Sequence, residues 1–328
     1  MTPSLEQARE TLRRVWGHAD FRGRQAEVVA EMLAGRDALA VLPTGGGKSV
    51  CYQLPALLRP GAGLVVSPLV ALMADQVAAM GQLGLRAERL DAGVGGADRT
   101  RIFRALEAGE LDLLYLSPEG LMAGALERLQ GARLALIAID EAHCVSQWGH
   151  DFRPEYRQLG RLADLFPGVP RLAVTATADA RTLADIRVQL RMPQAAEFVA
   201  SFARPELALS AERKERSGPQ GGHGRAVELA AERRGRSGVV YAGTRRATEE
   251  IAMALQARGV PALAYHAGLD KDLRNERLHR FLEAEEMVMC ATIAFGMGVD
   301  KPDVRFVIHA DPPESIEAYW QEIGRAGR

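Results

Sequence analysis

A chain of 328 residues, of which 47% are hydrophobic and 25% charged, is long enough to bury two separate cores. Its formal net charge of −1 excludes a broad basic surface of the kind that wraps DNA, although local arginines and backbone amides can still bind a few phosphates. Cys51, Cys144 and Cys290 form no CxxC pair, which argues against a disulfide framework or a cysteine zinc site. The N-terminus has no apolar secretory core and no run of about 18 apolar residues follows, so we expect a soluble, intracellular protein.

Short apolar runs alternate with longer helical patterns in two series, as buried parallel strands and crossover helices do. The first series comprises residues 37–42, 63–68, 111–118, 134–140 and 171–178. After a polar stretch at 210–224, the second series comprises residues 237–244, 261–268, 286–296 and 304–311. This pattern predicts an α/β fold with two tandem domains, residues 1–204 and 205–328, divided near Arg204 and Pro205.

Lysine is rare in this chain. The basic residues are arginine except at four positions, Lys48, Lys214, Lys271 and Lys301. A position that keeps lysine against this bias indicates a need for a compact ammonium group, which a planar guanidinium cannot imitate. Lys48 is the most informative of the four, because three glycines precede it.

The first predicted strand runs into PTGGGKSVCYQLPALL, which reads as strand, phosphate loop and helix. The glycines allow backbone N–H groups to approach phosphates, the lysine can reach the β and γ oxygens, and the serine can ligate Mg²⁺. The strict template requires glycine where Leu42 stands, but the three glycines meet the physical requirement; a turn without a ligand is the alternative. The predicted nucleotide-binding residues of this loop are Thr44, Gly45, Gly46, Gly47, Lys48 and Ser49.

The run LALIAIDEAH delivers two adjacent carboxylates at the end of a fully apolar strand. Ligands of open α/β sheets bind at such strand ends. We expect Asp140 to hold Mg²⁺ together with Ser49, and Glu141 to position or deprotonate the attacking water. The alternative is an ordinary charge pair at a helix N-terminus.

From DEAH onward the chain resembles superfamily 2 helicases, and CVSQWGHDFRPEYRQL is similar to the aromatic-rich loop that marks RecQ helicases. Further segments resemble successive helicase motifs in the expected order: FRGRQ, TGGGKS, SPLVALMADQV, YLSPE, TATA, YHAGL, ATIAFGMGVDKPDVRFVIH and QEIGRAGR. The chain is thus identified as a member of the RecQ family. The resemblance implies two tandem RecA-like domains of the P-loop NTPase type, with an ATP-binding domain followed by a helicase C-terminal domain.

The resemblance also implies an adenine site ahead of the phosphate loop. Gln25 in FRGRQ stands at the family glutamine that reads adenine, for which an amide offers both a donor and an acceptor. His18 occupies the position of the usual stacking tyrosine, with Arg22 on the other side of the base. His18 as a simple helix-end residue is the alternative.

In the aromatic-rich loop, Trp148 and Phe152 offer faces on which bases can stack without regard to sequence. Core packing of Trp148 is the alternative. The resemblance implies that this loop couples DNA binding to ATP hydrolysis, that His143 links the nucleotide site to it, and that Thr175 and Thr177 relay the nucleotide state. Polar DNA contacts are predicted for Gln147, His150, Asp151 and Arg153.

Hydroxyl groups and arginines at other strand and helix ends complete the predicted site. Ser67 and Thr292 follow apolar strands and can bind phosphate oxygens of DNA, although a serine before proline is also common turn chemistry. In QEIGRAGR, Arg325 and Arg328 are candidates for an arginine finger that stabilises charge on the γ-phosphate. A solvated basic helix end is the alternative.

The resemblance implies ATP hydrolysis with Mg²⁺, 3′-to-5′ movement on single-stranded and partially duplex DNA, and roles in recombination and repair. It further implies a cytoplasmic protein of bacterial type located with the nucleoid. Single-strand-binding and recombination proteins are the expected partners, and a monomer is expected. Because the chain stops inside its last motif, we expect a fragment that lacks the zinc and winged-helix modules and unwinds weakly. A superfamily 2 RNA helicase and a nucleotide-dependent DNA clamp without unwinding activity are the rival readings.

Overall fold

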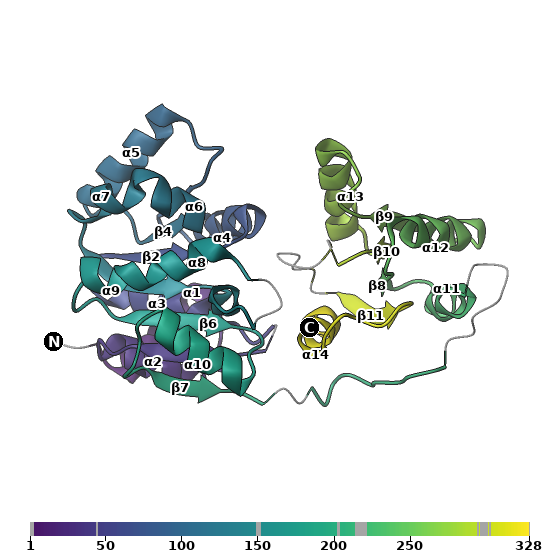
Figure 1. Cartoon of the computed structure of the whole chain (residues 1–328), viewed down its shortest axis with the longest axis horizontal. Coiled ribbons are helices and arrows are strands. Elements are labelled where there is room, and N and C mark those ends of the chain that lie inside the picture. The colour runs from purple at the N-terminus through teal and green to yellow at the C-terminus, as the bar shows by residue number, and fades with distance from the viewer. Residues whose placement is uncertain are drawn as a thin grey trace. The chain divides into compact units, whose positions relative to one another are not determined.

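The computed structural model describes residues 3–43, 45–148, 152–201, 204–213, 222–293, 295, 301 and 303–327. The chain divides into two compact units, Met1–Phe202 and Ala203–Arg328 (Figure 1). Each unit is built on a parallel β-sheet with its own apolar core. The predicted α/β class is therefore confirmed.

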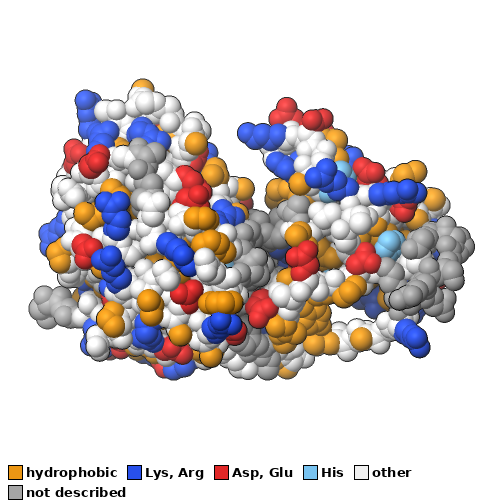
Figure 2. Space-filling model, viewed as in Figure 1, with side chains coloured by type: hydrophobic (Ala, Val, Ile, Leu, Met, Phe, Trp, Pro, Cys, Tyr) orange, Lys and Arg blue, Asp and Glu red, His pale blue; other side chains and the backbone are white. Residues whose placement is uncertain are grey.

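The surface carries both signs of charge side by side. On the face drawn in Figure 2, Lys and Arg side chains are intermixed with Asp and Glu on both units. This agrees with the formal net charge of −1. Among the described residues, no helix has the length and apolar character needed to cross a membrane.

The first unit contains seven strands in the order β3-β4-β2-β5-β6-β1-β7. All neighbouring strands of this sheet pair in parallel, so each connection crosses over the sheet. The strands are β1 Ala38–Val41, β2 Ala62–Val66, β3 Ala87–Leu90, β4 Leu113–Leu116, β5 Leu134–Ile139, β6 Arg171–Thr175 and β7 Ala196–Val199.

Helices cover both faces of this sheet (Figure 1). On one face pack α2 Gln25–Leu33, α3 Val50–Leu58 and α4 Val70–Gln82, with α1 Leu5–Trp16 behind α2 and α3. On the other face pack α5 Gly96–Glu107, η1 Leu121–Ala125, α7 Leu126–Leu129, α8 Pro154–Arg157, η3 Gln158–Arg161, α9 Leu162–Leu165 and α10 Ala180–Gln189. Short turns α6 Pro118–Gly120 and η2 Ala142–Val145 follow β4 and β5.

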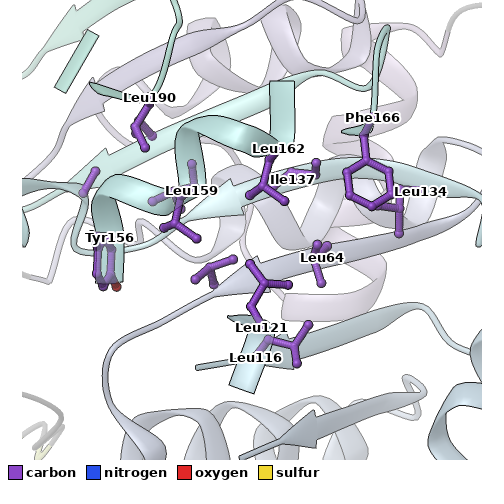
Figure 3. Packing of buried hydrophobic residues seen from close by; sticks show 14 of the residues in the cluster. Leu64, Leu116, Leu121, Leu134, Ile137, Tyr156, Leu159, Leu162, Phe166 and Leu190 are labelled. Atoms are coloured by element: carbon purple, nitrogen blue, oxygen red, sulfur yellow. The ribbon is translucent and has the colours of Figure 1, made fainter. Parts of the chain in front are cut away.

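Alternate residues of each central strand enter opposite cores, which is the period-2 geometry of a strand. In β5, Ile137 and Ile139 join one cluster, whereas Leu136 and Ala138 join the other. Figure 3 shows Ile137 packed with Leu162 and its neighbours in the first of these clusters. Because both faces are buried, the central strands are continuously apolar, and this is why the sequence pattern predicted them.

The two strands that the sequence pattern did not predict, β3 and β7, are the two edges of the sheet. Their sequences are AERL and AEFV, and charged residues interrupt the apolar run in both. Edge strands tolerate charge because one side has no strand partner and is accessible to water. An apolar-run criterion therefore misses them.

The second unit contains four parallel strands in the order β11-β8-β10-β9. These are β8 Ser237–Tyr241, β9 Ala262–Tyr265, β10 Val288–Ala291 and β11 Val304–His309, all of them at predicted positions. The helices are α11 Gly224–Ala231, α12 Arg245–Ala257, α13 Lys271–Glu283 and α14 Ile316–Ile323. Here too the strand residues alternate between two cores, one containing Val240 and Cys290 and the other Val239 and Met289.

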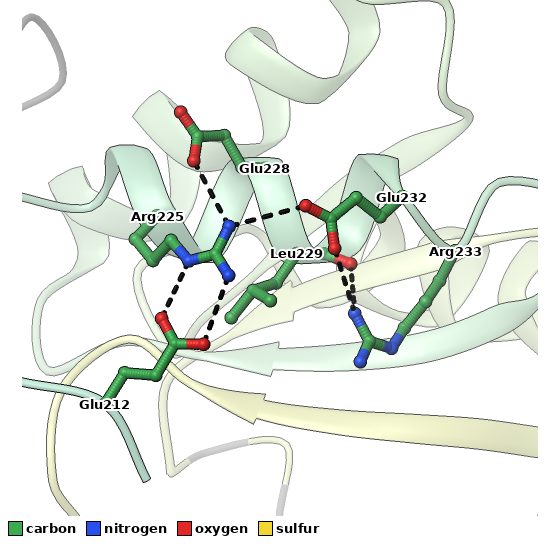
Figure 4. Close-up of polar contacts among 6 residues, drawn as sticks. All are labelled: Glu212, Arg225, Glu228, Leu229, Glu232 and Arg233. Carbon is green, nitrogen blue, oxygen red and sulfur yellow. Dashed lines mark hydrogen bonds and ion pairs between the residues drawn. The ribbon is translucent and has the colours of Figure 1, made fainter. Parts of the chain in front are cut away.

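The segment 204–213 begins the described part of the second unit and is attached to it at both ends. At its far end, Glu212 accepts two hydrogen bonds from Arg225 of α11, at 2.7 and 3.1 Å (Figure 4). Glu228, on the same helix, and Glu232, at its C-cap, each lie 3.4 Å from the same guanidinium. These groups are exposed, so they fix the path of the segment more than they stabilise the fold.

At the near end of this segment, Arg204 donates hydrogen bonds to the carbonyls of Ala326 and Gly327, at 3.1 and 3.2 Å. The side chain of Leu207 packs into the same core cluster as Ala326. The segment therefore touches the end of QEIGRAGR directly.

Candidate functional site

The candidate residues of the first unit gather at one edge of its sheet, where β2, β5, β6 and β1 end side by side. The N–H of Asp140, just after β5, donates to the carbonyl of Val66 at the end of β2, at 2.8 Å. The N–H of Leu42, just after β1, donates to the carbonyl of Thr175 at the end of β6, at 3.0 Å. This is the edge at which open α/β sheets bind ligands.

The phosphate loop, residues 43–49, has a backbone that requires glycine. Gly45 and Gly47 adopt φ angles of +79° and +67°, a region that L side chains rarely occupy. A Cβ on Gly46 would lie 2.8 Å from the carbonyl oxygen of the residue three positions earlier. The loop then enters α3 at Ser49, so that the positive end of the helix dipole lies at the loop, as in anion-binding sites.

Gln25, the first residue of α2, holds this loop in place. Its Nε2 donates hydrogen bonds to the carbonyls of Gly46 and Gly47, at 2.9 and 3.0 Å, and its Oε1 accepts from the N–H of Arg22 at 2.8 Å. Both amide protons are thus used within the protein, and the oxygen keeps a second lone pair for a base amino group. His18 lies exposed beyond the end of α1, and the side chain of Arg22 is exposed nearby in sequence.

Lys48 and the two carboxylates after β5 form a buried charged group. The Nζ atom of Lys48 lies 3.6 Å from Oε1 of Glu141, and both side chains are largely buried. Glu141 has a φ angle of +47°, an uncommon strained conformation of the kind found at functional sites. Burial, together with the charge of Glu141, raises the pKa of Asp140 to about 7, and Lys48 opposes this rise.

His143 connects this charged group to the TATA segment. Its Nδ1 lies 2.7 Å from Oγ1 of Thr175 and 3.4 Å from Oε2 of Glu141. The Thr175 hydroxyl in turn lies 3.4 Å from the N–H of Thr177, which donates to it. The buried hydroxyls of Thr177 and Ser67 have no hydrogen-bond partner within the described part of the chain, so both are available to a ligand.

The aromatic-rich loop is exposed and tied to the sheet edge. Trp148 is 56% exposed, so it is not a core residue, and Gln147 beside it is also exposed. Phe152 is half-buried. Arg153 donates to the carbonyl of Pro68, the residue after Ser67, at 3.1 Å.

In the second unit, Thr292 follows β10, and its N–H donates to the carbonyl of Tyr265 at the end of β9 at 3.2 Å. Arg325 follows α14 and is only 5% exposed, so it is not a solvated helix end. Its guanidinium lies 5.6 Å from the ring centroid of Phe295. Burial raises the pKa of Tyr241 to about 12, while the nearby charge of Arg325 opposes the rise.

Four residues that the sequence assigned to the site lie outside the described residues: Thr44, His150, Asp151 and Arg328. One buried neighbour of the site was not predicted. The hydroxyl of Tyr156 donates to the carbonyl of Asp140 at 3.0 Å and so fixes the end of β5. Tyr156 lies in the segment PEYRQL, which resembles the family loop. That resemblance alone does not tell whether the side chain belongs to the core or to the site.

The comparison with known families matches both units. The model described as "DEAD/DEAH box helicase" matches residues 22–186, and "Helicase conserved C-terminal domain" matches residues 225–328. The chain is 44% identical, over 98% of its length, to "ATP-dependent DNA helicase RecQ" of Haemophilus influenzae, and 40% identical, over 99%, to "Probable ATP-dependent DNA helicase RecS" of Bacillus subtilis. This chain belongs to the RecQ family of DEAD/DEAH box helicases.

The RecQ-family chain spans about half of the Haemophilus influenzae relative, 51%, and 65% of the Bacillus subtilis one. Solved structures agree in fold. They include the helicase MrfA, with a TM-score of 0.78, 20% identity and coverage of 99% of this chain and 50% of that one. The helicase Lhr of Mycobacterium smegmatis gives a TM-score of 0.68, 21% identity and coverage of 99% and 46%. The predicted family and the RecA-like α/β fold are confirmed.

Proposed function

We propose that this RecQ-family chain is the ATP-driven core of a DNA helicase, in which ATP hydrolysis drives movement along single-stranded DNA and separation of the duplex. The observation that carries the proposal is the Lys48–Glu141 pair at 3.6 Å, set at the sheet edge beside the phosphate loop. Relatives at 40–44% identity bear the name ATP-dependent DNA helicase, which supports ATP as the substrate and DNA as the track.

ATP binding would change the partners of Lys48. Phosphate oxygens, cradled by the loop amides and the N-terminus of α3, would compete with Glu141 for the ammonium group. Glu141 would then be released to orient the attacking water and accept its proton, as a general base must. The carboxylate is held ready by its strained backbone and by His143, 3.4 Å away.

The donor set fits one Mg²⁺ ion held jointly by protein and substrate. No group of three or more His, Cys, Asp or Glu side chains among the described residues could hold a metal alone. Asp140 and Ser49 offer two oxygens, and the raised pKa of Asp140 marks a buried carboxylate short of positive charge. Asp140 and Ser49 would hold such a cation, which would supply positive charge to neutralise phosphate oxygens.

DNA would lie across the same edge of the sheet, over exposed aromatic side chains and buried hydroxyl groups. Trp148 and Phe152 would stack on bases, and Gln147, Arg153, Ser67 and Thr177 would contact the strand or report its presence through Thr175 and His143. In the second unit, Thr292 would bind a phosphate of the strand, and Arg325 would act as the arginine finger. We further propose that His18, Arg22 and Gln25 hold the adenine.

We propose 3′-to-5′ movement, a role in recombination and repair, and single-strand-binding and recombination proteins as partners. Duplexes with a single-stranded tail at one end or the other test the direction. Faster strand separation with a 5′ tail than with a 3′ tail would contradict the proposed polarity.

The decisive experiment measures ATP hydrolysis with and without single-stranded DNA. We expect strong stimulation by DNA, a loss of about 100-fold or more in Lys48→Ala, and loss of the stimulation in Trp148→Ala. Lys271→Ala, an exposed lysine on α13, and Val188→Ala, an exposed apolar residue on α10, are matched controls that keep the activity. Stronger stimulation by RNA of equal length, or none by either in folded protein that binds ATP, would contradict the proposal.

A further inference from the structure

An arginine outside the predicted site covers the exposed tryptophan. Arg181 is the second residue of α10, and its guanidinium carbon lies 3.2 Å from the centroid of the Trp148 ring. Trp148 nevertheless remains 56% exposed, so the guanidinium covers only part of the side chain. A planar guanidinium on an indole face is a stacking and cation–π contact.

The helix that carries Arg181 is fixed close to the nucleotide site. It begins three residues after Thr177, and its N-cap Asp179 accepts a hydrogen bond from the N–H of Thr182 at 2.7 Å. Leu183 and Ile186 pack into the core cluster that also contains apolar residues of the η2 turn, which begins within DEAH. The backbone at Arg181 is therefore held in a fixed position.

A continuous set of contacts leads from the carboxylates to this helix. Glu141 lies 3.4 Å from His143, His143 lies 2.7 Å from Thr175, and the Thr175 hydroxyl both accepts from and donates to the backbone of Thr177. The chain then enters α10 at once. A change of partner at Glu141 thus has a short covalent and hydrogen-bonded route to Arg181.

We infer that Arg181 is a positioning residue for DNA: it presents Trp148 with one ring face covered and the other open to a base, and it ties that ring to the element that follows TATA. This inference rests on the proposed function. Without the guanidinium, the ring could rotate about its side-chain bonds, and stacking would first have to order it. Arg181 would not touch the base or the reacting atoms.

The competing explanation is that Arg181 binds a DNA phosphate directly. Arg181→Lys separates the two, because lysine keeps the charge but loses the planar stack. The salt dependence separates them as well, since loss of one phosphate contact lowers the slope of log affinity against log salt by about 0.7 for single strands. A positioning residue leaves that slope unchanged.

The first test needs neither ATP nor DNA. The chain has three tryptophans, so Trp16→Phe with Trp320→Phe leaves Trp148 as the only indole. In this background we expect Arg181→Ala to raise the acrylamide quenching constant by about 1.5- to 2-fold, because a second ring face opens to collisions. Arg161→Ala, which removes an exposed arginine from the same unit, should not change it. Equal quenching in Arg181→Ala and the parent would overturn the contact itself.

The second test measures the affinity for single-stranded DNA over a range of salt, and the ratio of DNA-stimulated to DNA-free hydrolysis. We expect Arg181→Ala and Arg181→Lys both to lower the ratio and to weaken DNA binding by about fivefold, as for partial loss of one stacked base, with an unchanged salt slope. Full rescue by lysine, or a reduced slope in Arg181→Ala, would overturn positioning. If the parent protein shows no stimulation by DNA, the proposed function fails, whereas the quenching result stands alone.

Discussion

The Nδ1 atom of His143 lies 2.7 Å from the Oγ1 atom of Thr175, and this contact joins the DEAH segment after β5 to the end of the neighbouring strand β6. Both side chains are buried, at 1% exposure each. A buried contact of this kind has no water to replace it. A displacement of the DEAH segment should therefore also displace the end of β6.

Replacing Thr175 by valine keeps the size of the side chain and removes the hydroxyl. We expect a loss of about 1–3 kcal/mol in the free energy of unfolding, because a ring nitrogen of His143 is left without this partner. We also expect a smaller stimulation of ATP hydrolysis by DNA. Denaturant unfolding and hydrolysis rates measure the two effects, and Thr175→Ser, which keeps the hydroxyl, is the control. Unfolding at the same denaturant concentration in Thr175→Val and Thr175→Ser would count against this role of the hydroxyl.

Gly47→Ala should distort the phosphate loop through both backbone strain and a steric clash. The backbone there has a φ angle of +67°, and an added Cβ would lie 2.4 Å from Nε2 of Gln25. We expect nucleotide affinity, measured by titration of a fluorescent ATP analogue, to fall by more than about tenfold, since left-handed strain alone costs about 1–2 kcal/mol. Gly95→Ala is the control, because Gly95 has a φ angle of −64° and no atom near the added carbon. Unchanged affinity in Gly47→Ala would show that the loop does not form the nucleotide site.

The raised pKa of Asp140, to about 7, predicts a pH-dependent stability in the absence of metal and nucleotide. Because this carboxyl holds its proton in the folded state up to about pH 7 but loses it near pH 4 when unfolded, the folded state binds more protons between these values. The free energy of unfolding should therefore fall as the pH rises from about 4 to 7. Asp140→Asn should remove the contribution of this carboxyl to that fall. Urea midpoints at pH 5 and pH 8 with a chelator test this. A parent and an Asp140→Asn variant with parallel pH profiles would contradict it.

Lys301 shows why one of the rare lysines is retained. It is 4% exposed, and its Nζ donates to the carbonyls of Leu282 and Ala284, at 3.3 and 2.7 Å, and pairs with Asp303 at 2.8 Å. Lys301→Met should lower the free energy of unfolding by about 2 kcal/mol. This is less than the loss expected on breaking a fully buried ion pair, because Asp303 is partly exposed. Lys301→Arg should also destabilise, by about 1–3 kcal/mol, because the larger group overfills the site. The measurement is urea unfolding followed by tryptophan fluorescence, with Lys271→Arg as control. A free energy of unfolding in Lys301→Arg equal to that of the parent would show that a compact ammonium group is not required.

The sequence pattern located the buried parts of the fold and missed the exposed parts. All nine apolar runs became strands, since a strand buried on both faces must be apolar throughout. The edge strands β3 and β7 carry charge, so their signal resembles that of a loop. The same principle placed Lys48 beside Glu141, because both follow strands that end at one edge of the sheet.

Contacts of side chains distant in sequence could not be read from the pattern. Gln25 was expected to face adenine, and its bonds to the loop carbonyls of Gly46 and Gly47 depend on how α2 packs against α3. Arg181 was one arginine among many, and nothing in its local sequence marks it as a neighbour of Trp148. Only the arrangement of α10 beside the aromatic-rich loop brings the two together.

The hydrogen bonds from Arg204 to the carbonyls of Ala326 and Gly327 close the described part of the second unit into a ring, because they join its first residue to its last. Tension applied between the two joined residues, Arg204 and Gly327, would be borne first by these two bonds. The sheet β11-β8-β10-β9 would carry load only after they had broken.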